Sequence, residues 1–301
     1  MIPDWLNYHH LRYFHVVARE GSIARASRVL HTSPPSISTQ LRQLEASLGE
    51  RLFRRQGRGL ALTEVGQLVQ EYAEQICALG GELVETVRGR PSTRPALIRI
   101  GIAEAVPKEL SARLLEPLFE GDERVRVVVH EDVAEQLLAE LALHRCDLVL
   151  LDEPPATISR LKVFQHALGD AAIGVFGRRA VAAKLRRRFP ESLDGSPFVL
   201  PIEDQLLRRE FDRWAAEREL RVDIAAEVED SALLKVLARG GRGLLLAPSV
   251  LASTLEKHHG LTRVGELPDV RLPYLACTVA RRIANPLVAR VLDRARDLLA
   301  G

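Results

Sequence analysis

Residues 22–63 constrain the fold of this chain more than any other stretch, because few folds other than a winged helix-turn-helix need their order of residue types. Ser22 is a good N-cap for a short helix whose apolar residues recur at helical spacing. After a polar turn, Ser33 is placed to cap a second helix, and Pro34 takes the first helical position, where a missing N–H costs nothing. A basic, glycine-containing loop at 54–59 then separates two short apolar segments, which predicts a two-stranded wing.

The second helix is predicted to have one buried and one polar face. Its apolar stripe consists of Ile37, Leu41, Leu44 and Leu48, and Gly49 ends the helix. The opposite face is rich in hydroxyl groups and carries an arginine, which suits the major groove of DNA. The predicted groove contacts are Ser33, Ser36, Ser38, Thr39 and Arg42. The wing residues predicted to meet phosphates or the minor groove are Arg54, Arg55 and Arg58.

The charge distribution also favours a nucleic-acid-binding head. Residues 1–62 contain nine arginines and four acidic residues, a net charge of +5, whereas residues 63–90 contain two arginines and five glutamates, a net charge of −3. The whole chain carries only +2, so positive charge is concentrated where it steers and anchors a polyanion. An amphipathic helix beside a solvated basic loop is the alternative, but the order of helix, turn, polar helix and wing favours DNA binding.

Composition is typical of a globular protein without a membrane segment. Of the 301 residues, 47% are hydrophobic and 27% are charged, and no apolar run reaches the roughly 18 residues that a span needs. The N-terminus does not resemble a secretion signal, and three scattered cysteines indicate buried thiols in a reducing compartment, so we expect a cytoplasmic protein. Without a metal-ligand spacing, phosphate-binding loop or nucleophile elbow, we expect no metal, no cofactor and no enzymatic activity.

Residues 63–90 predict a long linker helix. Its apolar residues alternate spacings of four and three, as in a coiled-coil seam. Such a helix cannot bury its stripe alone, so we expect it to pair with a second chain, which also supplies a second recognition helix. The alternative is that the stripe packs on the protein's own body. The predicted dimerisation residues are Tyr72, Ile76, Leu79 and Leu83.

Beyond a predicted hinge at 91–96, strand-like and helix-like runs alternate, which indicates an α/β architecture with largely parallel sheets. The expected strands are Ile98–Ala103, Val125–His130, Asp147–Leu151, Ala172–Phe176, Phe198–Ile202, Val222–Val228, Gly243–Ala247 and Leu275–Ala280. The expected helices include Leu110–Phe119, Ala134–Leu143, Leu206–Glu219, Ala232–Arg239 and Pro286–Leu299. We assign 97–168 with 270–301 to lobe I and 169–269 to lobe II, with a ligand cleft between them.

Head, linker helix and ligand domain together resemble the LysR-type transcriptional regulators over essentially the whole chain. The matching residues of the head are Leu11–Phe14, Gly21-Ser22, Ala26, Leu30, Pro35, Ile37-Ser38, Gln40-Leu41, Leu44-Glu45, Leu48-Gly49, Leu52–Arg55, and Leu62-Thr63 with Gly66. Those of the ligand domain are Arg99–Ile102, Leu141, Asp147–Leu150 and Ala247-Pro248. Within the family, the chain is most similar to the NhaR-type regulators of sodium/proton antiporters, at Asn7-Tyr8, His10-Leu11, Arg58–Leu60, Ile102–Ala105, Asp230, Ala232-Leu233 and Lys235.

The resemblance implies an N-terminal winged helix-turn-helix (1–62), a long linker helix (63–90) and a two-lobed α/β effector domain like a periplasmic binding protein. It implies a homodimer or homotetramer that binds promoter DNA, responds to a small effector and, as an activator, has RNA polymerase as a partner. The positions that usually meet DNA in the family are matched by Ser33, Pro35, Ser38, Thr39 and Arg58. Pro34 stands where many relatives have a base-reading glutamine, so operator specificity does not carry over.

Two other classes of protein fit parts of the sequence. One is an enzyme that binds a small molecule and has a regulatory DNA-binding head, but no motif for catalysis supports it. The other is an architectural DNA-binding protein, which leaves the α/β body unexplained.

Carboxylates follow five of the predicted strands, at the edge where α/β folds hold ligands. They are Glu104, Glu131-Asp132, Asp152-Glu153, Glu203-Asp204 and Glu229-Asp230. An acidic rim favours a cation, a polyamine or another amine as effector, and the resemblance to antiporter regulators points to Na⁺ or a linked signal. The alternative is that acids such as Asp132 and Asp230 only cap helices. The candidate effector contacts are Ala103, Glu104, Ala105, Asp132, Glu203, Asp204 and Asp230.

Overall fold

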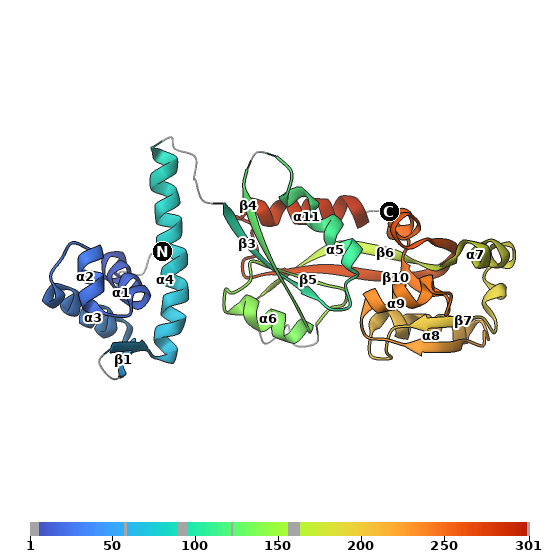
Figure 1. Cartoon of the computed structure of the whole chain (residues 1–301), viewed down its shortest axis with the longest axis horizontal. Coiled ribbons are helices and arrows are strands. Elements are labelled where there is room, and N and C mark those ends of the chain that lie inside the picture. The colour runs from blue at the N-terminus through green and yellow to red at the C-terminus, as the bar shows by residue number, and fades with distance from the viewer. Residues whose placement is uncertain (1–5, 57–58, 89–94, 122, 156–162, 300–301) are drawn as a thin grey trace. The chain divides into compact units, whose positions relative to one another are not determined.

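The computed structural model describes residues 6–56, 59–88, 95–121, 123–155 and 163–299. The chain forms two compact units, Met1–Thr93 and Arg94–Gly301. In Figure 1, the colour runs from blue at the N-terminus to red at the C-terminus, so the chain can be traced through each unit. Residues 91–94 of the predicted hinge lie outside the described residues.

The first unit is a helix-turn-helix with a wing and a long helix. Its elements are α1 (Tyr8–Glu20), α2 (Ile23–Val29), α3 (Pro34–Leu48), β1 (Phe53–Gln56), β2 (Gly59–Leu62) and α4 (Glu64–Val87). Both predicted helix caps are confirmed, because Ser22 Oγ accepts the Arg25 backbone N–H and Ser33 Oγ accepts that of Ser36. These bonds satisfy N–H groups that the first turn of a helix otherwise leaves unpaired.

The core of the head lies between α3, α1 and the start of α4. Ile37, Leu41 and Leu44 are buried as predicted, together with Phe14 of α1. Gly49 ends α3 in the left-handed conformation, with a φ of 74° that glycine adopts without strain. The order of elements predicted from residues 22–63 is therefore the order in the structure.

Close contacts hold the start of α4 against Arg51-Leu52, the short segment before the wing. Thr63 Oγ1 donates to the Arg51 carbonyl oxygen at 2.7 Å and accepts the Gly66 N–H at 2.9 Å, so one hydroxyl caps α4 and ties it to this segment. A Cβ on Gly66 would lie 2.1 Å from the Leu52 carbonyl oxygen, which accepts the Thr63 N–H. The approach of α4 to Leu52 therefore requires glycine at position 66.

A mixed sheet forms the centre of the second unit. Its strand order is β4 (Val125–Asp132), β3 (Ala96–Ala103), β5 (Leu148–Leu151), β10 (Leu261–Thr278), β6 (Phe164–Arg178) and β9 (Leu245–Pro248). β3 is parallel to β4 and β5, but the pairings of β10 with β5, of β10 with β6 and of β6 with β9 are antiparallel. The expectation of largely parallel sheets is wrong here, because the long strands β6 and β10 run antiparallel to each other and to their outer neighbours β9 and β5. A separate parallel pair consists of β7 (Pro197–Leu200) and β8 (Asp223–Glu227).

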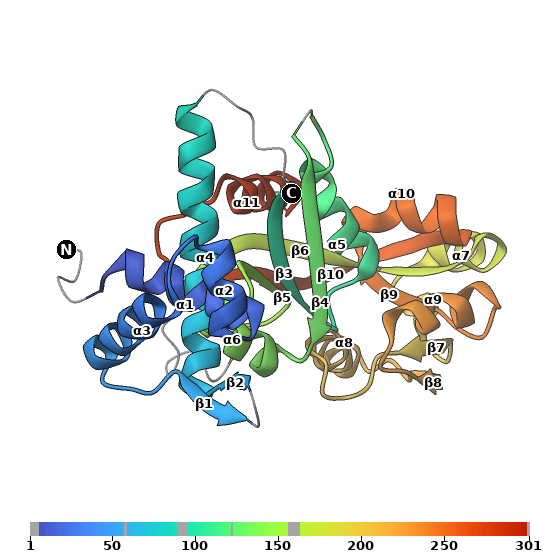
Figure 2. The ribbon, with the colours of Figure 1, turned by 60° about the vertical axis from the view of Figure 1, so that its left-hand side comes forward.

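The paired strands β6 and β10 extend through both lobes (Figures 1 and 2). Sequence analysis predicted only Ala172–Phe176 and Leu275–Ala280 of this pair. Gly169-Asp170 and Pro268-Asp269 interrupt the apolar pattern with residues typical of turns, which hid the full length of both strands. The structure accommodates Pro268-Asp269 at a register shift between Glu266 and Arg271, where extra residues bulge from the ladder.

Helices cover both faces of the sheet in lobe I. α5 (Lys108–Leu115) and α11 (Pro286–Leu299) pack together on one face, and α6 (Ala134–Ala142) lies on the other (Figure 1). Pro117, which lacks an N–H, lies in a 3-10 turn (Glu116–Leu118) that replaces the end of the helix predicted over Leu110–Phe119. The larger of the two cores lies between these helices and the strands.

Lobe II buries its strands on two sides. Phe198 and Leu200 of β7 face the smaller core with Phe211 of α8 (Leu206–Glu217), whereas Val199 faces the larger core with Leu234 of α9 (Ser231–Arg239). Shorter elements complete the lobe: α7 (Arg179–Leu185), 3-10 turns at Arg186–Arg188, Glu191–Leu193 and Ser249–Leu251, α10 (Ala252–Thr254) and a π-helical turn (Leu255–His259).

Within the described ranges, no helix is both long enough and apolar enough to cross a membrane. Cys146 and Cys277 are buried as predicted, whereas Cys77 on α4 is half-buried. Burial raises the pKa of both buried thiols to about 11, so they are protonated at neutral pH.

Replacing Gly66 with alanine is expected to lower the free energy of unfolding by about 1–3 kcal/mol, because the added Cβ overlaps a fixed backbone carbonyl. Gly80→Ala is the matched control, since it lies in the same helix and nothing lies within 4 Å of its added Cβ. It is expected to raise the free energy of unfolding by about 0.5–1 kcal/mol. Urea unfolding followed by circular dichroism measures both variants, and equal effects would contradict the close contact at Leu52.

Candidate nucleic-acid interface and ligand cleft

The polar face of α3 presents hydroxyl oxygens whose own protons are already donated within the helix. Ser38 Oγ donates to the Pro34 carbonyl oxygen at 3.0 Å, and Thr39 Oγ1 donates to that of Pro35 at 3.1 Å. The Arg42 guanidinium donates to Thr39 Oγ1 at 3.4 Å. Because their protons are engaged, these oxygens are available as acceptors, which suits the amino groups of cytosine and adenine in a major groove.

The other predicted groove contacts lie at the N-terminus of the same helix. Ser33, Pro35 and Ser36 are exposed, as are Thr39 and Arg42, while Ser38 is half-buried. The Ser33 and Ser36 hydroxyl oxygens lie 2.8 Å apart. The structure therefore places all six predicted groove contacts on α3 or at its N-cap, with Ser33, Pro35 and Ser36 at the N-terminal end, where backbone N–H groups also favour an anion.

The wing is the antiparallel pair of β1 and β2. Arg54 is exposed on β1, and Arg55 follows it in the same strand. Arg58, the third predicted wing contact, lies outside the described residues.

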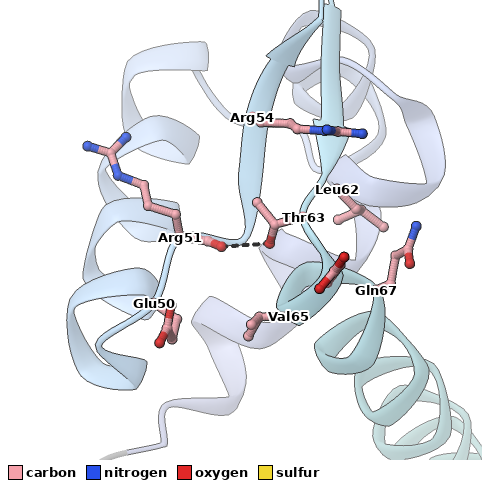
Figure 3. A pocket seen from close by; sticks show the side chains of 8 residues that line it. Glu50, Arg51, Arg54, Leu62, Thr63, Val65 and Gln67 are labelled. Atoms are coloured by element: carbon pink, nitrogen blue, oxygen red, sulfur yellow. Dashed lines mark hydrogen bonds between the residues drawn. The ribbon is translucent and has the colours of Figure 1, made fainter.

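A depression of about 500 Å³ lies between the wing and the start of α4 (Figure 3). Arg51 and Arg54 line it together with Glu50 and Glu64, so its cationic and acidic side chains balance. Figure 3 shows the Thr63 hydroxyl between these groups, bonded to the Arg51 carbonyl. The depression thus lacks the excess of positive charge that a phosphate site needs.

Glu45 is a structural residue of the head that sequence analysis did not assign. Its Oε1 accepts the Leu52 N–H at 2.8 Å and the Phe53 N–H at 3.3 Å. One carboxylate on α3 thereby fixes the first residues of the wing. A glutamate on the polar side of a helix carries no local signal of this role, because its partners are set by the tertiary fold.

One side of α4 packs on the head and another is exposed. Ala73 is buried and Ile76 is half-buried against the head core, whereas Leu79 and Leu83 are 68% and 64% exposed. Tyr72 is also exposed. Of the predicted dimerisation residues, Ile76 therefore belongs partly to the head, and the exposed apolar surface is concentrated in the C-terminal half of α4.

Parallel pairing gathers the predicted carboxylates of lobe I at one edge of the sheet. β3 and β4 end side by side, with Ala103 opposite Asp132. Glu104 and Ala105 follow β3 directly. Glu131 and Asp132 were expected after a strand but belong to β4 itself.

Lobe II has a corresponding edge where β7 and β8 end. The acids that follow these strands are Glu203, Asp204, Glu229 and Asp230. Gln205 Nε2 donates to the Glu229 carbonyl oxygen at 3.2 Å, which ties the two strand ends together. A 2.6 Å ion pair between Glu153, after β5, and Arg209 of α8 connects this edge with that of lobe I. The two lobes therefore meet at their acidic edges.

Several of these acids already have partners within the chain. Lys108 Nζ lies 2.5 Å from a Glu131 carboxylate oxygen. Asp132 and Asp230 each accept a backbone N–H at 2.8 Å, which makes Asp230 the N-cap of α9, as the capping alternative required. All five candidate effector acids are exposed. Among the described residues, no side-chain hydrogen bond or ion pair occupies the carboxylates of Glu104, Glu203 and Asp204, in contrast to those of Asp132 and Asp230.

Asp152 is the buried acid of this edge, at 8% exposure. Burial raises its pKa to about 6, and the charge of Glu153 adds to this effect, while a backbone hydrogen bond and Arg209 oppose it. Within the described part of the chain, no group of three or more His, Cys, Asp or Glu side chains is placed to hold a metal ion.

A buried ion pair joins α5 with α9. Glu109 Oε2 lies 2.5 Å from Lys235 Nζ, and Glu109 Oε1 lies 3.1 Å from His259 Nε2. Burial opposes ionisation of Glu109, but the hydrogen bond and charge of Lys235, together with His259, hold its pKa below the ordinary value. Sequence analysis did not connect these residues, because Lys235 and His259 are 126 and 150 positions from Glu109.

Both units match known protein families. Residues 8–67 match the family described as "Bacterial regulatory helix-turn-helix protein, lysR family", and residues 93–300 match "LysR substrate binding domain". The chain belongs to the LysR family of transcriptional regulators. It therefore combines a DNA-binding head with an effector domain, which confirms the fold class and the family resemblance predicted from the sequence.

Curated relatives match this regulator over nearly its whole length. The transcriptional activator protein NhaR of Escherichia coli (strain K12) is 29% identical over 293 residues, which cover 97% of this chain and 96% of NhaR. The RuBisCO operon transcriptional regulator of Allochromatium vinosum is 28% identical over 284 residues, 91% of this chain and 90% of the relative.

Solved structures of regulators share the fold. ArgP from Mycobacterium tuberculosis aligns with a TM-score of 0.56 at 19% identity and covers 98% of both chains. Full-length CbnR, solved in complex with its target DNA, aligns with a TM-score of 0.52 at 19% identity, covering 98% of this chain and 100% of CbnR.

Proposed function

We propose that this regulator binds promoter DNA as a homodimer or homotetramer and that a small effector, bound between its lobes, controls it. The observation that carries the proposal is the exposed face of α3, with hydroxyl acceptors and a guanidinium, on a head that matches the LysR-family helix-turn-helix. Where the regulator activates transcription, as its relative NhaR does, RNA polymerase is its partner.

The proposed contacts divide by chemistry. The residues of α3 that meet the major groove are Ser33, Pro35, Ser36, Ser38, Thr39 and Arg42, and those of the wing that meet the backbone or the minor groove are Arg54, Arg55 and Arg58. The hydroxyl-rich helix supplies the groups that discriminate bases, whereas the arginines of the wing supply charge for phosphates. The wing thus contributes to affinity on any DNA, and α3 contributes to the choice of sequence.

Assembly is proposed to use the exposed apolar surface of α4. Leu79, Leu83 and Val87 lie four positions apart and are exposed, as is Tyr72, about two turns before Leu79. Burying each large apolar side chain contributes roughly 1.5–3 kcal/mol, which a second copy of the same helix provides symmetrically. A dimer also presents two recognition helices to two half-sites.

The proposed effector is a cation or an amine. It is supported by the exposed carboxylates at the facing edges of the lobes, above all Glu104 after β3, with Glu203 and Asp204 after β7. Arg209 and Lys108 neutralise Glu153 and Glu131, so the exposed acids set the charge that a ligand meets. The resemblance to regulators of sodium/proton antiporters supports Na⁺, or a signal linked to it, and regulation of cation/proton antiport.

For DNA binding, Arg54→Ala is expected to weaken binding to every sequence and to reduce the salt slope of log K by about one unit for each protomer on the DNA, because each loses one phosphate contact. Ser38→Ala is expected to cost about fivefold on the operator and less on random DNA, because it removes an acceptor for bases. Arg12→Ala is the matched control. It removes an arginine of the same head, but Arg12 belongs to α1 and its charge lies near Cys77 of α4. Fluorescence anisotropy at several salt concentrations measures all three, and an unchanged slope for Arg54→Ala removes the wing from the interface.

For assembly, Leu79→Asp with Leu83→Asp is expected to reduce the oligomer mass and to abolish tight operator binding, because like charges then face each other across an apolar seam. Ala78→Asp is the control for an added carboxylate, since it places one at an exposed neighbouring position of α4 outside the row of Leu79 and Leu83. Sedimentation gives the mass and anisotropy the affinity. A double variant that keeps both would place assembly elsewhere in the chain.

For the effector, a promoter reporter is measured with NaCl, with KCl and at alkaline pH. Glu104→Gln is expected to lose most of the responses to NaCl and to alkaline pH, with KCl as the reference salt, because the substitution removes an exposed charge at the proposed ligand site. Glu120→Gln, an exposed acid in the loop before β4, is the matched control. If Glu104→Gln responds like the unmodified protein, or if only carboxylates activate the reporter, the cation proposal is wrong.

A further inference from the structure

A strongly cationic surface lies on lobe II, away from the acidic edge where the two lobes meet. Residues 178–188 contain six cationic residues and no acid. All six side chains are exposed: Arg178, Arg179, Lys184, Arg186, Arg187 and Arg188. They are carried by the end of β6, by α7 and by the following 3-10 turn, and we refer to them as the arginine surface. Figures 1 and 2 both show α7 at the outer end of lobe II, away from β3, β4 and β5.

Neighbouring segments extend the same charge. The Arg178 side chain reaches to 3.2 Å from the Cβ position of Gly241, so it borders the turn that carries Arg239 and Arg242, both exposed. On the other side, the Arg186 guanidinium donates to the Arg263 carbonyl oxygen.

A depression of about 450 Å³ opens between Arg186 and Arg263. Glu266, 3.5 Å from Arg263, is the acid that lines it. Cations therefore outnumber acids both on α7 and at the depression beside it.

The arginine surface has no evident task within the fold. Other arginines of lobe II are paired, for example Arg208 with Glu227 and Arg221 with Asp194. Among the described residues, by contrast, no ion pair joins Arg187 or Arg188 to an acid. Crowded like charges repel one another and disfavour the folded state, and an anionic partner offsets that repulsion.

We propose that the arginine surface is a second DNA-contacting surface, which binds the phosphate backbone beside the operator sequence. This proposal rests on the proposed DNA binding by the head. Guanidinium groups are always charged and donate paired hydrogen bonds to phosphate oxygens. Contacts to phosphate oxygens fix the position of a protein on DNA and carry no sequence information, so the surface adds affinity without adding base specificity.

The test measures binding of the full-length protein to two duplexes at several salt concentrations. One contains the operator alone, about two helical turns, and the other adds flanking DNA to about seven turns. The variant is Arg187→Gln with Arg188→Gln. The control is Arg281→Gln with Arg282→Gln, an adjacent pair of exposed arginines between β10 and α11. Circular dichroism and thermal unfolding confirm that both variants fold.

On the long duplex, the variant is expected to lose at least about tenfold in affinity and up to two units of salt slope for each protomer that reaches the flanking DNA, because each such protomer loses two phosphate contacts. On the short duplex, variant and unmodified protein are expected to bind equally, and the control is expected to be unaffected on both. Equal loss on both duplexes, or no loss on the long one, overturns the proposal. If the variant binds both duplexes like the unmodified protein but no longer activates a reporter, the proposal is also overturned, and the arginine surface binds an acidic protein instead.

The short duplex separates this inference from the proposed function. Failure of the unmodified protein to bind it contradicts base reading by the head. Even then, a lower affinity of the variant for the long duplex supports DNA binding by the arginine surface.

Discussion

The antiparallel pairing of β6 with β10 is the interaction on which the effector unit depends. The two strands contribute to both cores, with Leu168 and Ala276 in the larger and Val175 and Leu272 in the smaller. Their ladder also pairs backbone groups that would otherwise be buried without partners. Neither lobe can keep its core without these strands, so relative motion of the lobes has to bend or twist the pair. The register shift between Tyr274 and Leu275 is a place where such a ladder is already interrupted.

The head is held by shorter-range contacts of a different kind. Glu45 fixes the backbone at Leu52, Thr63 ties the start of α4 to Arg51, and Gly66 lets the helix approach. These contacts all converge on Arg51-Leu52, the segment before the wing. The position of the wing relative to α3 therefore follows from one short segment, which keeps the proposed base contacts of α3 and the proposed phosphate contacts of the wing in a fixed relation.

Much of the head could be predicted from the sequence because its signals are local. Ser22 and Ser33 cap the helices that directly follow them, and Gly49 ends α3. The effector unit was harder, because strand direction and length depend on partners far along the chain, and the turn-like residues at Pro268-Asp269 lie inside β10. Carboxylates could be placed at the ends of strands, but only the structure shows that the Asp230 side chain caps α9 while the equally exposed Glu104 side chain caps no helix.

The pair of Glu109 and Lys235 has a consequence for how this sequence can change. Burying two charges costs hydration that their attraction only partly returns, so the pair contributes little net stability while it fixes how α5 lies against α9. Lys235 is 4% exposed, so removal of Glu109 alone would leave an ammonium group with neither water nor its carboxylate. Replacing both residues with apolar residues of similar volume is compatible with the packing, whereas replacing only one of them leaves the other charge buried without its partner. These two positions, 126 residues apart, are therefore constrained to vary together.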